Sequence, residues 1–197
     1  MLIEDLGYEV VPLSAAVDLV RRGNRLARPT LAITFDDGWA DNLENAYPEL
    51  ARRGWPGTVF IPTSYLGRRP YLYPEEVPGL AELGIVVENH THSHRNLTDL
   101  GPSELLEDLR KCNDRLQDLT GRRPRFLCYP NGRYSPAVRK VVSESGLEAA
   151  CSARVGFNPK GQDLFLLRRL TMEGGDGPRE LRIRFAGGYD FLDRSQG

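Results

Sequence analysis

The chain has 197 residues, of which 40% are hydrophobic and 27% are charged, with a formal net charge of −1 and a sequence pI near 6.3. This composition is that of a globular protein and excludes a disordered chain. The balanced charge gives no electrostatic footprint for nucleic acid or an anionic membrane, and the length favours a single domain over residues 1–197.

Short apolar runs alternate with amphipathic stretches, which predicts strands that alternate with helices. The apolar runs predict strands at 30–35, 57–61, 85–89, 125–129, 148–151 and 166–170. Helices are predicted at 13–20, 43–53, 75–83, 104–119, 178–185 and from Ser135 through Val142. Nearly continuous apolar strands are typical of parallel sheets that are buried on both faces. The chain is therefore predicted to be an α/β protein, and periodicity alone leaves an open sheet and a closed barrel as alternatives.

The two clearest helices carry their own boundary signals. Gly101-Pro102 precedes a stripe of apolar residues at helical spacing: Leu105, Leu109, Cys112, Leu116 and Leu119. Ser135 followed by Pro136 is a favourable N-cap and first-turn pair for the next helix.

No run of 18 apolar residues is present, so no membrane span is predicted. The first eleven residues carry three acidic side chains and lack the pattern of a secretory signal. The three cysteines form neither a metal-ligand pattern nor a disulfide framework, which fits a reduced compartment or buried thiols. As it stands the chain is expected to be cytoplasmic, and extracytoplasmic if a leader lies upstream.

The first segment that could carry chemistry is Asp36-Asp37-Gly38, directly after the predicted strand 30–35. Parallel sheets and barrels place their sites at the carboxyl ends of strands. Taken alone, an Asp-Asp-Gly turn that begins the next helix is the more common explanation.

The second segment, His90-Thr91-His92-Ser93-His94, follows the predicted strand 85–89 and holds all three histidines of the chain. Neutral imidazole is the commonest metal ligand, and three histidines at one strand end are hard to explain structurally. The segment therefore predicts a metal site.

Two arrangements of that site compete. A His90/His92 pair would need further histidines from later strands, and none follows His94. A His90/His94 pair with an aspartate from the first strand leaves coordination positions open for water and substrate. The histidine count favours the second arrangement and leaves His92 as a spacer or a supporting residue.

These motifs resemble those of the polysaccharide deacetylase family (carbohydrate esterase family 4, the NodB homology domain). Thr34 to Gly38 and His90 to His94 resemble its first two motifs, and Tyr129-Pro130-Asn131-Gly132 resembles its third. The segments 58–61, 165–170 and 188–190 add to the likeness, which covers about residues 8 to 193.

The resemblance implies an irregular (β/α)7 barrel of the glycoside hydrolase/deacetylase type and a role for each matched residue. Asp37, His90 and His94 match the metal ligands, and Asp36 matches the base that deprotonates a metal-activated water. The backbone N–H of Asn131 matches a donor to the tetrahedral oxyanion. Zinc is the expected ion, while cobalt, nickel or iron also suits these ligands.

The implied substrate is an N-acetylated sugar in a polysaccharide or glycoconjugate. Trp39, Tyr129, Pro130 and Tyr134 are predicted to contact it, and loop aromatics are candidates for stacking on sugar rings. These aromatics are Trp39, Tyr65, Tyr71, Tyr73 and Tyr134.

The sequence departs from the family pattern at three places. Cys128 stands where an arginine often orients the base, so Arg168 or Arg169 is predicted to replace that arginine. A late histidine that protonates the leaving amine is missing, and its role would fall to Asp36, solvent or a residue such as Asp176. The chain also begins at a segment that relatives place further along, which implies that a strand or helix over the barrel's edge is absent.

The missing acid keeps three alternatives open beside the deacetylase. These are an O-acetyl esterase, a hydrolase of another amide, and a catalytically impaired carbohydrate-binding relative. An ester has the better leaving group and would suffer less from the loss of an acid.

Overall fold

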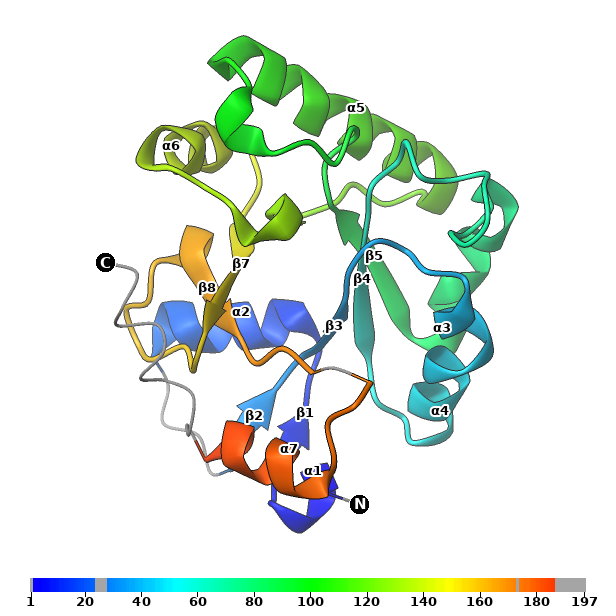
Figure 1. Cartoon of the computed structure of the whole chain (residues 1–197), viewed down its shortest axis with the longest axis vertical. Coiled ribbons are helices and arrows are strands. Elements are labelled where there is room, and N and C mark those ends of the chain that lie inside the picture. Colours follow the sequence, from blue (N-terminus) through cyan, green and yellow to red (C-terminus); the bar gives the residue numbers. More distant parts are fainter. Residues whose placement is uncertain (1, 24–27, 173, 187–197) are drawn as a thin grey trace.

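The computed structural model describes residues 2–23, 28–172 and 174–186. Six parallel strands form one sheet in the order β3-β4-β5-β6-β7-β8. Their bounds are β3 Ile33–Phe35, β4 Gly57–Ile61, β5 Ile85–Asn89, β6 Phe126–Cys128, β7 Ala149–Val155 and β8 Leu167–Arg169. Two further short strands, β1 (Glu9–Val10) and β2 (Thr30–Leu31), pair in parallel just before β3 (Figure 1).

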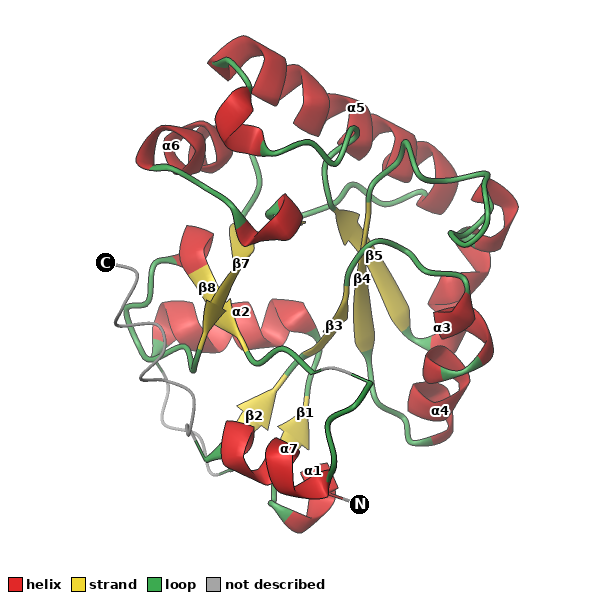
Figure 2. Ribbon diagram, viewed as in Figure 1, coloured by secondary structure: helices red, strands yellow, loops and turns green. Residues whose placement is uncertain are grey.

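The six-stranded sheet curls into a half-barrel with helices around it (Figure 2). The helices are α1 Leu2–Asp5, α2 Leu13–Arg22, α3 Asp41–Glu44, α4 Ala46–Arg52, α5 Pro102–Thr120, α6 Pro136–Glu144 and α7 Pro178–Phe185. The predicted α/β class is confirmed. No helix of the described ranges combines the length and the apolar character needed to cross a bilayer.

Packing explains why the apolar stripes lie where they do. All five residues of β4 are buried, as expected of a strand covered on both faces. On α5 the predicted stripe is buried against the sheet at Leu105, Leu109, Cys112 and Leu116. Each large apolar side chain buried in this way contributes about 1.5–3 kcal/mol relative to exposure.

Several predicted boundaries were wrong for local reasons. The stretch 75–83 forms two 3-10 helices, η1 (Pro74–Glu76) and η2 (Pro78–Leu83), because Pro78 removes an N–H donor in its middle. The stretch 43–53 is divided into α3 and α4, and the stretch 30–35 into β2 and β3. The last predicted strand begins as a 3-10 turn, η5 (Leu164–Leu166), before β8. At α6 the predicted cap is present, since the Ser135 hydroxyl accepts a hydrogen bond from Val138 N–H at 3.2 Å.

Candidate active site

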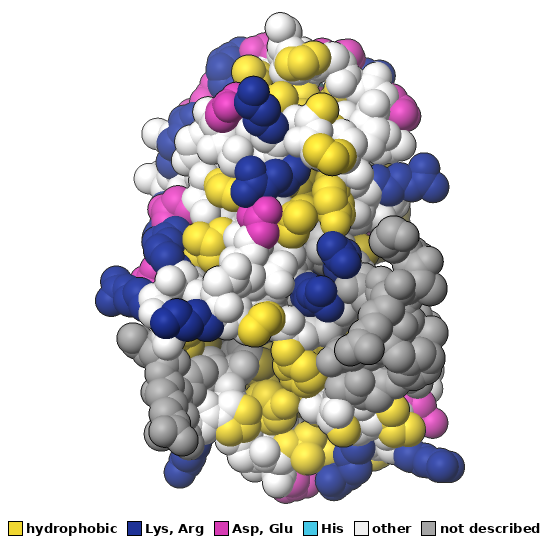
Figure 3. Space-filling model, turned by 90° about the vertical axis from the view of Figure 1, so that its left-hand side faces the viewer, with side chains coloured by type: hydrophobic (Ala, Val, Ile, Leu, Met, Phe, Trp, Pro, Cys, Tyr) yellow, Lys and Arg dark blue, Asp and Glu magenta, His cyan; other side chains and the backbone are white. Residues whose placement is uncertain are grey.

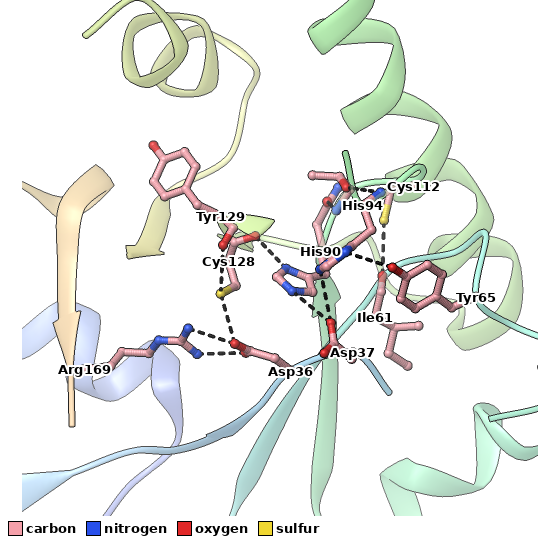
Figure 4. A network of polar contacts seen from close by, with 12 residues as sticks. Asp36, Asp37, Ile61, Tyr65, His90, His94, Cys112, Cys128, Tyr129 and Arg169 are labelled. Carbon is pink, nitrogen blue, oxygen red and sulfur yellow. Dashed lines mark hydrogen bonds and ion pairs between the residues drawn. The ribbon is translucent and has the colours of Figure 1, made fainter. Parts of the chain in front are cut away.

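The side chains that could carry chemistry lie at the carboxyl ends of parallel strands of one sheet (Figure 4). Asp36 and Asp37 follow β3, His90 to His94 follow β5, and Cys128 ends β6. The parallel topology therefore brings together residues that are about 35 to 90 positions apart in sequence.

Asp37, His90 and His94 form a compact triad. The Asp37 Oδ1 atom lies 3.4 Å from His90 Nε2 and 3.2 Å from His94 Nε2. Neighbouring ligands of a tetrahedral ion with bonds of about 2.0–2.1 Å are separated by about 3.3 Å. The spacing of the three ligand atoms therefore fits a divalent ion such as zinc.

The hydrogen bonds of His90 support the same conclusion. Its Nδ1 atom lies 2.7 Å from the carbonyl oxygen of Cys128, which can only accept a hydrogen bond. In the neutral ring Nδ1 therefore carries the proton, and Nε2 turns a lone pair toward Asp37. Asp37 Oδ1 is buried and has no hydrogen-bond partner in the described part of the chain. His90 Nε2 and Asp37 Oδ1 are both acceptors and face each other, and a cation bound between them would give each of them a partner.

The other side of the triad is held by Tyr65. Its hydroxyl lies 2.9 Å from His94 Nδ1 and the two rings are 5.1 Å apart, so Tyr65 fixes the orientation of the imidazole. His92 does not join the triad. Its Nδ1 atom lies 2.8 Å from the hydroxyl of Thr63, in the loop that follows the neighbouring strand β4.

The histidine loop depends on two residues that the sequence interpretation missed. Asn89 accepts a hydrogen bond from Thr91 N–H at 2.6 Å and donates to Leu109 and Asn113 of α5. Asp108 accepts hydrogen bonds from the N–H groups of His92 and Ser93, at 2.8 Å and 3.2 Å. The available signals were the polar Asn89 at the end of an apolar strand and the acidic Asp108 beside the buried stripe of α5.

Backbone strain is concentrated at this site. In the described ranges, four residues other than glycine have positive φ: Asp37 (70°), Thr91 (69°), His94 (56°) and Asn131 (54°). Two of them belong to the triad, and the other two lie in loops beside it. Such conformations persist only where the surroundings hold them, and they are typical of functional sites.

Asp36 lies beside the triad and is bound by Arg169 of β8. The guanidinium donates two hydrogen bonds to the carboxylate, each 2.8 Å long, across the open side of the half-barrel. Burial acts to raise the pKa of Asp36, but the bonds and charge of Arg169 outweigh it and hold that pKa below the ordinary value. The Cys128 thiol, 3.6 Å from the same carboxylate, is buried and its pKa is raised. Arg169 rather than Arg168 thus occupies the predicted position.

The turn after β6 carries the predicted oxyanion donor. Asn131 has a left-handed backbone, and Gly132 follows it at φ 66°. A Cβ atom on Gly132 would lie 2.1 Å from the Ala153 Cβ, so only glycine allows this turn to approach β7 so closely. The side chains of Tyr129 and Pro130 are both buried, and their contact with substrate stays a prediction. Tyr134 is half-buried and packs on Tyr129, with 5.5 Å between the rings.

Three aromatic residues, here called the aromatic rim, extend outward from His94. Tyr65 stacks on Tyr71 with ring centroids 4.5 Å apart, and Tyr71 stacks on Trp39 at 4.8 Å. Trp39 is 39% exposed and presents a ring to solvent within this row. The predicted Tyr73 lies apart from this row, under the guanidinium of Arg69.

Comparison with known proteins agrees with this geometry. The chain is 25% identical over 173 residues to YxkH of Bacillus subtilis (strain 168), a match that covers 88% of this chain and 62% of YxkH. It is also 25% identical over 168 residues to the poly-β-1,6-N-acetyl-D-glucosamine N-deacetylase of Staphylococcus aureus (strain MRSA252), covering 78% of this chain and 58% of that protein. The chain thus spans about three fifths of the length of these relatives.

Solved structures share the fold. The Streptococcus pyogenes deacetylase PplD in complex with acetate superposes with a TM-score of 0.84 at 20% identity, covering 92% of this chain and 81% of PplD. IcaB from Ammonifex degensii superposes with a TM-score of 0.80 at 22% identity, covering 91% of this chain and 83% of IcaB. The family model for polysaccharide deacetylases matches residues 23–150, more than half of the chain. The chain therefore belongs to the polysaccharide deacetylase family.

Proposed function

We propose that the chain is a metal-dependent deacetylase that removes N-acetyl groups from an N-acetylated sugar in a polysaccharide or glycoconjugate. One observation carries the proposal. A carboxylate held in its charged form, Asp36, lies beside the triad of Asp37, His90 and His94, whose spacing suits a divalent ion. Family membership and the N-deacetylase named among the relatives support the choice of an acetylated sugar.

The triad would hold the ion, for which we propose zinc. When bound, such an ion acts as a Lewis acid toward the amide carbonyl and lowers the pKa of water. Tyr65 and the Cys128 carbonyl keep the two imidazole rings turned toward Asp37, so the ligands are positioned before the ion arrives.

Asp36 is proposed as the base that removes a proton from the attacking water. Arg169 keeps this carboxylate ionised and holds its direction, because both oxygens receive a hydrogen bond from one planar guanidinium. The Asn131 N–H is proposed to donate to the oxyanion that develops on the carbonyl oxygen.

The leaving amine needs a proton, and no histidine follows His94. Asp176 forms an ion pair with Arg184 at 3.1 Å, so its carboxylate is already engaged. We propose that Asp36 returns the proton it has accepted to the departing nitrogen. One carboxylate then serves both steps of the reaction.

Acetate release from N-acetylated glucosamine oligosaccharides tests the proposal, with β-1,4 and β-1,6 linkages measured separately. Activity should require added zinc or cobalt, vanish with a chelator, and be abolished in Asp36→Asn while zinc still binds. Release from O-acetylated sugars alone would favour the esterase instead. If zinc and glycan bind but no acetate is released from either substrate, the chain is a carbohydrate-binding relative.

A further inference from the structure

A large apolar cleft opens from the catalytic residues into the side of the half-barrel. It has a volume of about 800 Å³ and lies between α2, the strands β2 and β3, β8 and α7. Asp36, Asp37 and Trp39 line it at the catalytic end. Its apolar lining comes from Leu13, Val17, Val20, Leu31, Met172 and Phe185, among others.

This cleft also collects exposed apolar side chains. Of the five large hydrophobic residues exposed in the described ranges, Trp39, Phe157 and Met172 line the cleft. Met172 is 48% exposed and Phe157 is 42% exposed. On the face that carries α2 and β8, hydrophobic side chains gather in the lower half of the view (Figure 3). Apolar surface gathered around a concave site is typical of a place where a ligand binds.

The geometry points to one occupant, on the basis of the function proposed above. We propose that the cleft binds the apolar chain of a lipid-linked substrate, an N-acetylated sugar whose reducing end carries an alkyl or polyisoprenoid group. Trp39 belongs both to the aromatic rim and to the cleft lining, so a sugar over the rim places its aglycone at the cleft entrance. The acyl group removed is acetyl, which is too small to fill about 800 Å³. Of the two groups attached to the sugar, only the aglycone can be long and apolar enough to match this lining.

A homologous series of alkyl β-glycosides of N-acetylglucosamine, from methyl to octyl, tests this inference. Binding is measured on chelator-treated protein by displacement of an apolar fluorescent probe, below the micelle concentration of each glycoside. Each methylene buried in the cleft should lower the Kd about four-fold, since burial of a CH₂ is worth about 0.8 kcal/mol. A Kd that does not change with chain length overturns the inference.

Matched variants locate the binding. Phe157→Asp should weaken octyl glycoside binding at least about ten-fold. Leu106→Asp, at an equally exposed position on α5 away from the cleft, should leave it unchanged. A lipid occupant is contradicted if the two variants weaken octyl glycoside binding equally. It is also contradicted if sedimentation shows that the protein dimerises and the dimer does not bind the fluorescent probe. Chain-length-dependent binding without acetate release would refute the proposed function and leave the cleft assignment standing. Acetate release with a KM that does not change with chain length would support the proposed function and refute the assignment of the cleft.

Discussion

Replacing Arg169 tests how much of the reaction depends on holding Asp36. The two side chains are 21% and 32% exposed and share two hydrogen bonds of 2.8 Å. Hydrogen bonds to charged groups are worth about 1.5–3 kcal/mol each, and part of this energy is needed to keep Asp36 directed and ionised. If Arg169→Met raises the barrier by about 2–3 kcal/mol, kcat/KM should fall about 30- to 150-fold. Arg169→Lys keeps the charge but lacks the planar guanidinium, so its kcat/KM should lie between those of the parent and of Arg169→Met.

The chain offers a matched control for this experiment. Arg139 makes the same two-bond contact with Asp163, at 2.9 Å for both bonds, on the side of α6. Arg139→Met should lower the free energy of unfolding but leave kcat/KM within about two-fold of the parent. Acetate release is assayed at equal zinc content after circular dichroism confirms folding. The reasoning is refuted if zinc-loaded Arg169→Met keeps the parent kcat/KM, or loses no more than Arg139→Met does.

Three further changes probe the supports of the site. Tyr65→Phe removes the hydrogen bond to His94 and should weaken zinc binding about 10-fold or more, measured by chelator competition; unchanged affinity would mean that Tyr65 does not hold the ring. Asp163→Asn should lower the free energy of unfolding by about 1 kcal/mol at pH 7. Arg139 holds the pKa of Asp163 below its ordinary value, so this stabilisation is lost as the pH falls through the lowered pKa. In urea titrations, the free energies of unfolding of the parent and of Asp163→Asn should therefore differ less near pH 3 than at pH 7. A difference that does not change with pH would contradict the ion-pair explanation. Gly132→Ala should lower the free energy of unfolding by about 2–4 kcal/mol, because its backbone is left-handed and the added Cβ would overlap β7. Gly146 also has a positive φ but has open space around it, so Gly146→Ala should lower the free energy of unfolding by only about 1 kcal/mol. Similar losses in these two variants would show that the close approach is unimportant.

Local sequence patterns were enough to predict the α/β class and to predict which side chains would lie close together at the candidate active site. Apolar runs predicted every strand of the six-stranded sheet, because strands buried on both faces leave little choice of residue. Parallel strands then bring their carboxyl ends together, so Asp36-Asp37 and the histidine cluster were expected to be neighbours. The stripe on α5 was equally clear, because a 19-residue helix repeats its period several times.

Other features depended on tertiary contacts that have no local signature. Arg168 and Arg169 are chemically identical in sequence, and only the orientation of β8 decides which one reaches Asp36. The burial of Tyr129 follows from packing under α6, although its motif suggested a substrate contact. Asn89 and Asp108 were missed because most of their partners are backbone groups of the histidine loop and α5.

The left-handed residues at the site also influence how this protein can be altered. Strain of about 1–3 kcal/mol at each of the four positions is a large share of the 5–15 kcal/mol by which a typical domain is stable. Selection for heat resistance without selection for turnover should therefore favour glycine or asparagine at Thr91 and at His94. A laboratory lineage evolved only to survive heating would stabilise the fold first at the proposed metal site, and would lose the proposed activity while it gained stability.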